Sequence, residues 1–388
     1  MKYSIVVVGY NRPDSMRRLL ESLCCASYEV SCDLVISLDY GTRQEELLKI
    51  AENVKWMHGE KKIRKFQSAQ GLRQHILQCG DLTNEYDAVV VMEDDLVVAE
   101  NFFQYVIEAV EFYNNNDLIA GISLYTHHTN PGNGRAFEAQ FNGYDAYLMQ
   151  YAQSWGQCWT RKMWNAFRNW YDEQVEDIAL DGVVPNYVVG WNKQSWLKYY
   201  IRYTAEKGLF YVYPYFSLTT NSSEIGEHNK HNSTAYQVPL STGKMQGYRF
   251  PEVEDAVKYD AYFERIFEEP IDGCYGNILL DLYGLRKHFG NADTLISTQK
   301  LNYKILREIE LKYRPHELNC LRQEEGKGIY VYDLKELCVT KKKLGYCRLE
   351  ERLRIAQYDL KAESPRLTLL HGLNGVKENV KRRFCKKP

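Results

Sequence analysis

The sequence predicts an α/β fold in which a mostly parallel, doubly wound central sheet is followed by a smaller, mixed α/β appendage. Continuous β-branched and apolar runs, typical of strands buried on both faces, alternate with amphipathic helical patterns over residues 4–124. Polar residues directly follow several of these runs. Beyond about residue 250 the elements become shorter and richer in Tyr, Leu and charge.

Four apolar runs are expected to form strands, and amphipathic helices are expected between them. The runs cover residues 4–8, 34–38, 88–92 and 118–124. Pro13 stands at the first position of a helix with a regular apolar stripe, a place that suits its fixed backbone angle.

Two further helices are expected after the second run. Thr42 and Glu45 have the spacing of a capping box, which predicts a helix that starts at Thr42. A short helix follows around residues 71–79. Strands alternating with helices in this way favour parallel pairing.

The composition excludes several classes of protein. The 388 residues are 45% hydrophobic and 26% charged, which is ordinary globular usage rather than that of a disordered chain. A net charge of −2 argues against nucleic acid as a partner. The 31 Tyr residues suit ligands with polar edges and apolar faces, such as sugars and bases, but they also fill cores.

Several features predict a cytoplasmic protein. No apolar run reaches the roughly 18 residues that span a bilayer, and the N-terminus lacks the pattern of a signal peptide. The ten cysteines contain no C-x-x-C pair, so we expect free thiols.

Polar residues gather where three predicted strands end. Tyr10-Asn11-Arg12 follows the first strand, Asp39 the second, and Glu93-Asp94-Asp95 the third. Ligands of open α/β sheets bind beyond the carboxyl ends of the strands. Neither G-x-G-x-x-G after the first strand nor G-x-x-x-x-G-K-[ST] occurs, so dinucleotide oxidoreductases and P-loop NTPases fit poorly.

The three successive acids at 93–95 predict a divalent cation. Adjacent carboxylates at the end of a buried strand repel one another unless a cation neutralises them. Mn²⁺ or Mg²⁺, shared with diphosphate oxygens, is the cofactor that oxygen ligands of this kind favour. A single acid in such a place, Asp39 included, is as readily explained by a turn or a helix cap.

These residues resemble the GT-A glycosyltransferases, in particular the N-acetylglucosaminyltransferase I type and its bacterial, family-2-like relatives. The resemblance covers residues 3–235. It is carried by residues 4–13, 37–41, 89–96 with 101–103, 154–159, 195–200, 213–218 and 226–228. The Glu-Asp-Asp motif in its strand context is the specific part. The resemblance implies a Rossmann-like domain that binds a nucleotide sugar.

For the nucleotide, the resemblance implies contacts from the first strand ends. Tyr10, Asn11 and Arg12 would lie near it, and Asp39 would accept a hydrogen bond from the uracil imide. Arg73 would lie near the diphosphate, although an Arg at this point of a helix is equally explained as a solvated side chain.

For the sugar and the metal, the resemblance implies that Glu93 and Asp94 support the ribose and the donor sugar. Asp95 would bind the metal directly, and His228 would approach the metal or the diphosphate from a loop. Trp155 would form a wall of the donor or acceptor pocket. Without the resemblance, Trp155 is more simply explained as a core residue and His228 as a solvated residue of a loop.

The catalytic base departs from the pattern of the eukaryotic relatives. Residues 191–196 read Trp-Asn-Lys-Gln-Ser-Trp, which places an amide, Asn192 or Gln194, where those relatives have an acid. An amide accepts no proton near neutral pH. Asp181 or Glu227 then becomes the expected base, and a different mechanism or lost activity are the alternatives.

The sequence therefore predicts a metal-dependent, inverting glycosyltransferase of bacterial cell-surface polysaccharide assembly. It would move a hexosyl or N-acetylhexosaminyl group from a UDP-sugar to a hydroxyl of a glycan or lipid-linked acceptor. A sugar nucleotidyltransferase and an inactive protein that binds nucleotide sugars or glycans are the alternatives.

Three regions are expected along the chain. Residues 1–248 would form the GT-A domain, residues 249–368 an accessory region, and residues 369–388 a basic tail. Six basic residues among the last eighteen, with apolar residues between them, would allow an amphipathic contact with anionic lipid at the inner face of the plasma membrane. A solvated tail is the alternative.

Overall fold

The structure is a computed structural model that describes residues 1–174, 176–222, 236–243, 245–338, 344–359, 369 and 373. None of the helices in this part of the chain combines the length and the apolar character needed to cross a membrane. Eight of the ten cysteines, those from Cys24 to Cys338, are free thiols in the structure.

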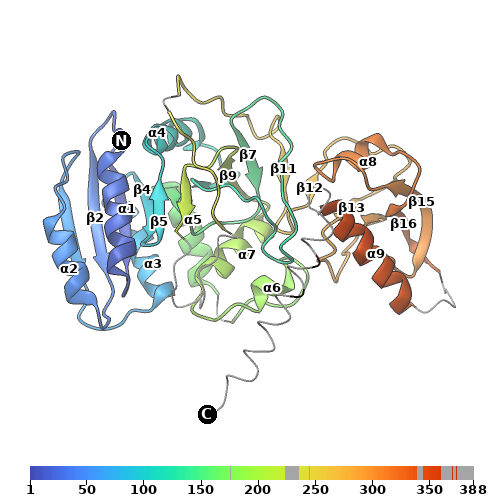
Figure 1. The fold of residues 1–388 in the computed structure, drawn as a ribbon, viewed down its shortest axis with the longest axis horizontal. Coiled ribbons are helices and arrows are strands. Elements are labelled where there is room, and N and C mark those ends of the chain that lie inside the picture. The colour runs from blue at the N-terminus through green and yellow to red at the C-terminus, as the bar shows by residue number, and fades with distance from the viewer. Residues whose placement is uncertain are drawn as a thin grey trace, which may run out of the picture.

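A ten-stranded sheet forms the centre of the molecule (Figure 1). In spatial order its strands are β12 (Arg265–Ile266), β11 (Lys258–Tyr259), β7 (Ala146–Met149), β9 (Phe210–Pro214), β6 (Ile119–Ser123), β8 (Gln157–Thr160), β4 (Ala88–Glu93), β1 (Tyr3–Gly9), β2 (Cys32–Leu38) and β3 (Lys61–Lys65). The four strands predicted from apolar runs are present as β1, β2, β4 and β6.

The sheet is mostly parallel, which confirms the predicted fold class. Strands β4, β1, β2 and β3 pair in parallel, and so do β6 with β9 and β7 with β11. Strand β8 lies between β4 and β6 and is antiparallel to both. Strands β4 and β6 therefore point the same way, and their carboxyl ends lie at the same edge as those of β1 and β2.

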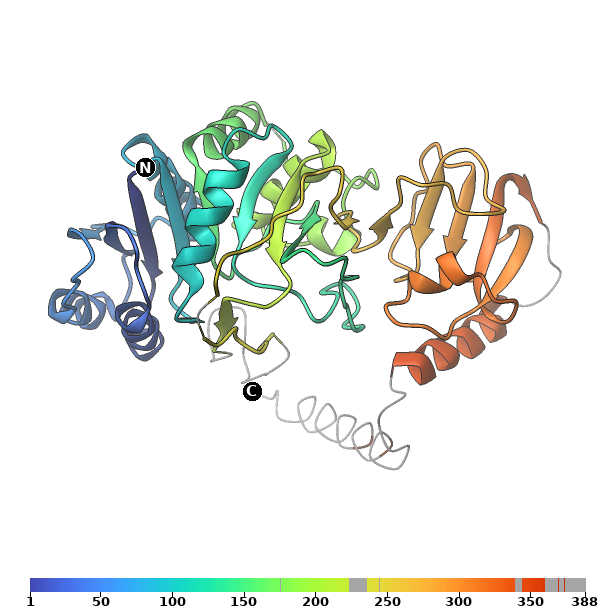
Figure 2. The same cartoon turned by 90° about the horizontal axis from the view of Figure 1, so that it is seen from above.

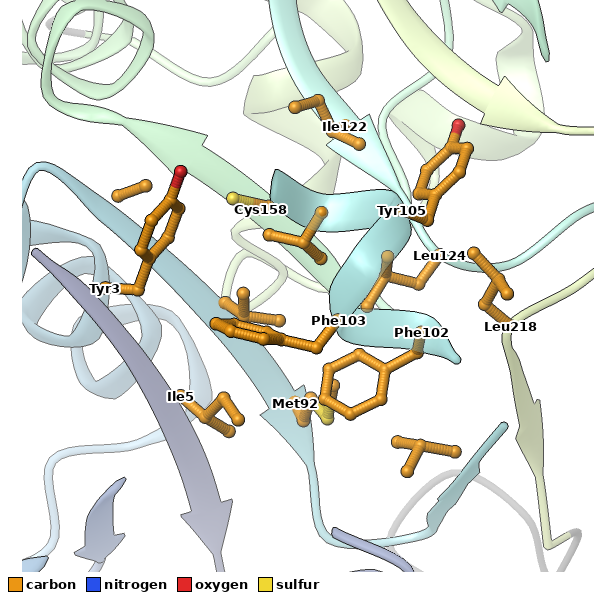
Figure 3. Close-up of a cluster of buried hydrophobic side chains, with 14 of the residues drawn as sticks. Tyr3, Ile5, Met92, Phe102, Phe103, Tyr105, Ile122, Leu124, Cys158 and Leu218 are labelled. Carbon is orange, nitrogen blue, oxygen red and sulfur yellow. The ribbon is translucent and has the colours of Figure 1, made fainter. Parts of the chain in front are cut away.

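Helices cover both faces of this sheet. Side chains from α1 (Pro13–Cys25), α2 (Gln44–Asn53) and α4 (Phe102–Tyr113) share one core cluster. Side chains from α3 (Leu72–Gly80), α5 (Arg161–Asp172) and α7 (Leu197–Lys207) share the other, on the opposite face. Figure 3 shows the first cluster, with Phe102 and Phe103 of α4 lying against Met92 of β4.

Short elements connect these layers. They are the 3-10 helix η1 (Asp81–Asn84), helix α6 (Asn186–Val189) and a two-stranded sheet of β5 (Leu96–Val98) and β10 (Thr219–Asn221). The predicted capping box at Thr42 is wrong. Helix α2 begins at Gln44 without a side-chain cap, because the Thr42 hydroxyl instead donates to Asn11 Oδ1 at 3.4 Å.

The C-terminal appendage is a four-stranded sheet with its own core cluster. It forms a separate lobe at one end of the long axis (Figures 1 and 2). Its elements are β13 (Ile278–Asp281), β14 (Thr294–Ser297), β16 (Gly328–Leu337), β15 (Tyr303–Glu310), α8 (Leu318–Arg322) and α9 (Leu344–Asp359).

The predicted domain division stays a prediction. Strands β11 and β12 come from the expected accessory region, yet they extend the central sheet. Contacts between the lobe and the rest of the chain include Arg135 Nε, which donates to Asp359 at 2.8 Å, and the Tyr259 hydroxyl, which donates to Glu317 at 2.5 Å. The predicted basic tail lies outside the described residues, apart from Leu369 and Leu373.

Candidate functional site

The loops after β1 and β4 meet at the carboxyl edge of the sheet, where the sequence places its polar motifs. The two strands are neighbours, and Val8 is in register with Glu93. Arg12 Nη1 donates to Asp95 Oδ2 at 2.8 Å, and Arg12 Nη2 donates to Asp94 Oδ1. The Tyr10 backbone N–H donates to the other oxygen of Asp94 at 3.0 Å. The structure therefore joins Tyr10, Arg12, Asp94 and Asp95 in one cluster.

Burial sets the protonation of these acids. It raises the pKa of Glu93 to about 8, with a further contribution from the charge of Asp95. It also raises the pKa of Asp94 to about 6, although Arg12 acts in the opposite direction. Near neutral pH Glu93 is therefore largely protonated, whereas Asp94 is largely ionised and pairs with the Arg12 guanidinium.

This arrangement bears on whether the acids need a metal ion. Three adjacent carboxylates without any counter-charge would need an external cation to relieve their repulsion. The chain supplies part of that relief itself through Arg12 and through the raised pKa of Glu93. Repulsion alone consequently does not require a metal at this edge.

The oxygen atoms around Asp95 nevertheless suit a cation. Asp95 is only 7% exposed, and its Oδ1 atom has no hydrogen-bond partner. The Ser222 backbone N–H donates to the Asp95 carbonyl oxygen at 2.7 Å, and the Ser222 hydroxyl is also buried and unpartnered. Such oxygens are the ligands that Mg²⁺ and Mn²⁺ prefer.

The protein ligands available there are few. Within the described ranges, no group of three or more His, Cys, Asp or Glu side chains is arranged to hold a metal ion. A cation at Asp95 would therefore need further oxygens from a bound ligand or from water. His228, the second predicted metal ligand, lies outside the described residues.

Asp39 is buried at the end of β2 and organises the backbone around it. Its Oδ1 accepts from the N–H groups of Tyr40 and Gln70, both at 2.8 Å. Its Oδ2 accepts from the N–H of Gly71 at 3.1 Å. The carboxylate thus fixes the loop that leads into α3, and its predicted contact with uracil stays a prediction.

Asn11 ties the loop after β1 to the loop after β2. Its backbone is left-handed, with φ of 54°, and its Oδ1 accepts from the Arg43 N–H at 3.0 Å. Gly41 makes this approach feasible, because a Cβ there would lie 2.4 Å from Asn11 Oδ1 and 2.9 Å from the Tyr10 ring. Tyr10 remains 36% exposed at this edge.

Arg73 and Trp155 are occupied by aromatic contacts. Arg73 Nη1 donates to the Tyr199 hydroxyl at 3.1 Å, and its guanidinium lies over that ring, which links α3 to α7. The Trp155 ring centroid lies 4.8 Å from that of Tyr125 and 4.9 Å from that of Tyr236. Their predicted contacts with the diphosphate and the sugar stay predictions.

The environment of Asp181 is unfavourable for a catalytic base. Its Oδ1 accepts from Arg202 Nη1 at 2.7 Å and from the Val183 N–H at 3.1 Å. The hydrogen bond from Arg202 lowers the pKa of Asp181, so this carboxylate holds a proton less readily than an ordinary Asp. Glu227, the other predicted base, lies outside the described residues.

Sequence reasoning missed a polar pair made by one residue after β6 and one after β7. His127 and Gln153 are buried, and Gln153 Nε2 lies 3.0 Å from His127 Nε2. Burial lowers the pKa of His127 to about 3, so the imidazole is neutral. The signal was present in the sequence, since Thr126-His127-His128 comes shortly after the apolar run at 118–124 that became β6.

Comparisons with known proteins give only distant similarities. No family model matches the chain, and no curated protein matches its sequence. S. aureus TarS 1–349 in complex with UDP-GlcNAc is similar at 12% identity over 59% of this chain and 60% of that one, with a TM-score of 0.38. GalNAc-T7 with UDP, GalNAc and Mn²⁺ is similar at 12% identity over 55% and 42% of the chains, with a TM-score of 0.37.

A mannosyltransferase from Pyrobaculum calidifontis, PcManGT, in complex with GDP-Man and Mn²⁺, is similar at 10% identity over 42% of this chain and 45% of that one, with a TM-score of 0.29. The chain thus spans less than two thirds of each of these structures.

Proposed function

We propose that this chain is a glycosyltransferase that moves a sugar from a nucleoside diphosphate sugar, a UDP-sugar, to a hydroxyl of a glycan or lipid-linked acceptor. The observation that carries the proposal is the cluster of Arg12, Asp94 and Asp95 at the carboxyl edge of β1 and β4. It combines a partly exposed guanidinium with a buried carboxylate oxygen that has no partner.

The chemistry of these groups matches a diphosphate. A guanidinium can bind phosphate oxygens through two parallel hydrogen bonds, and both terminal nitrogens of Arg12 already donate to oxygen acceptors, one on Asp95 and one on Asp94. Arg12 is 25% exposed, so ligand oxygens have access to it. Asp95 Oδ1 and the Ser222 hydroxyl would hold a divalent cation, which when bound stabilises the negative charge of a leaving diphosphate.

The neighbouring loops offer groups for the nucleoside. Tyr10 and Tyr40 are 36% and 52% exposed and follow adjacent strands, so that their rings are available to a base. Asp39 fixes the loop that borders them through three backbone hydrogen bonds. A nucleoside at the ends of β1 and β2 would place its diphosphate towards Arg12.

The test is the release of UDP from UDP-sugars in the presence of Mn²⁺. We expect turnover by the wild type and loss of turnover in Asp95→Asn, with the melting temperature retained. Asp14→Asn is the matched control, because Asp14 is an exposed acid in the first turn of α1 that pairs with Arg17. Equal rates for Asp95→Asn and the wild type would refute the role of Asp95.

An inactive protein that binds nucleotide sugars is the second candidate function. It is favoured by the ion pair between Asp181 and Arg202, which occupies the predicted base, and by the amide of Asn192. In that case UDP-sugars would raise the melting temperature without release of UDP above background. Release of UDP that depends on an acceptor would exclude it.

A further inference from the structure

We infer that Arg12 is an internal counter-ion that keeps divalent cations from Asp95 until a nucleoside diphosphate binds. The nucleotide and the cation would then bind cooperatively, each raising the affinity for the other. This inference rests on the proposed function and concerns the regulation of the same site.

Arg12 contacts both Asp94 and Asp95 in the structure. One guanidinium nitrogen donates to Asp95 Oδ2 at 2.8 Å, and the other donates to Asp94 Oδ1. Both acids are buried, with exposed fractions of 2% for Asp94 and 7% for Asp95. Charged pairs screened so little by solvent remain strong at physiological salt.

The chain itself offers few ligands to a cation at Asp95. Arg12 holds one oxygen of Asp95, and the other oxygen has no partner. Mg²⁺ and Mn²⁺ favour six oxygen ligands. No group of three acidic, His or Cys ligands occurs within the described parts of the chain. A cation that arrives alone would therefore find few protein ligands and a positive guanidinium beside them.

When a diphosphate binds, Arg12 can exchange its carboxylate partner for phosphate oxygens. Phosphate oxygens accept from a guanidinium in the same bidentate manner as carboxylates do. Arg12 can therefore pass from Asp95 to the diphosphate, which releases Asp95 Oδ2. Neither oxygen of Asp95 would then be paired with the guanidinium, so Asp95 and the diphosphate oxygens would be available to a cation that was previously repelled.

Coupling of this kind is reciprocal, which makes it measurable in two ways. Binding of Mn²⁺ can be followed by electron paramagnetic resonance of the free ion, with and without UDP. Binding of UDP can be followed by calorimetry, with and without Mn²⁺. For the wild type we expect UDP to tighten Mn²⁺ binding at least tenfold, and Mn²⁺ to tighten UDP binding by the same factor.

Variants of Arg12 separate a counter-ion from a simple phosphate ligand. Arg12→Met removes the charge, so Mn²⁺ should bind severalfold more tightly without UDP than it does to the wild type. The factor by which UDP tightens Mn²⁺ binding should fall to the part that comes from diphosphate oxygens serving as ligands of the ion. Arg12→Lys keeps the positive charge but loses the paired N–H donors of the guanidinium. This variant should still bind Mn²⁺ only weakly without UDP. Arg17→Met, which changes an exposed Arg of α1, is the control and should behave as the wild type.

The outcomes are distinguishable. If the wild type binds UDP but holds Mn²⁺ equally well with and without it, the inference is overturned while the proposed function stands. If Arg12→Met loses the coupling without tighter Mn²⁺ binding, Arg12 is only a diphosphate ligand, and the counter-ion role is again overturned. If the wild type binds neither UDP nor UDP-sugars under any condition, the proposed function itself fails.

Discussion

The substitution Asp39→Asn tests whether one buried carboxylate holds the loop between β3 and α3. The three N–H groups that Asp39 accepts come from Tyr40, Gln70 and Gly71. Asn has nearly the same shape but only one acceptor oxygen. If this oxygen keeps the bonds to Tyr40 and Gln70, the amide nitrogen faces the Gly71 N–H, and two donors meet.

The size of the effect follows from these contacts. An N–H group that loses its partner in a partly buried place costs about 1–3 kcal/mol. The two remaining bonds also lose the ionic character that strengthens them. We therefore expect the free energy of unfolding to fall by about 2–3 kcal/mol, a large share of the roughly 5–15 kcal/mol that stabilises a typical domain.

Urea unfolding gives the stability, and hydrogen exchange of the amides of Gln70 and Gly71 reports on the loop itself. Both amides should exchange faster in Asp39→Asn than in the wild type. The control Asp14→Asn breaks only an exposed pair and should change stability by less than about 0.5 kcal/mol. Unchanged urea midpoints and unchanged exchange at both amides would show that the carboxylate does not hold this loop.

The central strands were predictable because a strand buried on both faces needs a continuous run of apolar residues. The run at 4–8 became β1 (Tyr3–Gly9), and the run at 88–92 became β4 (Ala88–Glu93), every residue of β1 being buried. Strand β3, by contrast, reads Lys-Lys-Ile-Arg-Lys. It lies at the edge of the sheet, where charged residues are favoured because they prevent further pairing, so it carries no apolar signal.

The order of the strands was not predictable from local patterns. Strand β8 contributes only four residues, and it enters the sheet antiparallel between β4 and β6. Nothing within Gln157–Thr160 specifies those neighbours. They follow from how the whole chain buries its two apolar faces, which is a property of the assembled sheet.

In the candidate site, too, the types of the residues were predictable from the sequence, but the contacts between them were not. Sequence reasoning found Arg12 and the Asp94-Asp95 motif separately, and it assigned Arg12 to a nucleotide, Asp94 to the ribose and donor sugar, and Asp95 to a metal ion. It could not pair them, because the pairing depends on β1 and β4 being neighbours in the sheet. The charge balance of the site is thus decided by strand order, which the local sequence does not encode.

Three further substitutions test the packing, the lobe contact and the electrostatics. Gly80→Ala should destabilise the protein by about 1–3 kcal/mol in urea unfolding, because a Cβ there would lie 2.2 Å from the Trp164 ring. Arg135→Met removes the contact of 2.8 Å with Asp359 and should speed proteolysis within α9, whereas an unchanged cleavage rate would contradict a role for this pair in docking the lobe. The third substitution, Glu93→Gln, tests the raised pKa of about 8. The folded protein keeps a proton on Glu93 that the unfolded chain, with its ordinary pKa of 4.5, releases. Stability is therefore lost as the pH rises from about 4.5 to about 8, since the unfolded chain binds fewer protons over this range. Gln cannot ionise, so the variant should lose less stability than the wild type between pH 5 and pH 8.5, as measured by urea midpoints. Equal losses in the two proteins would mean that Glu93 ionises as readily in the folded protein as in the unfolded chain.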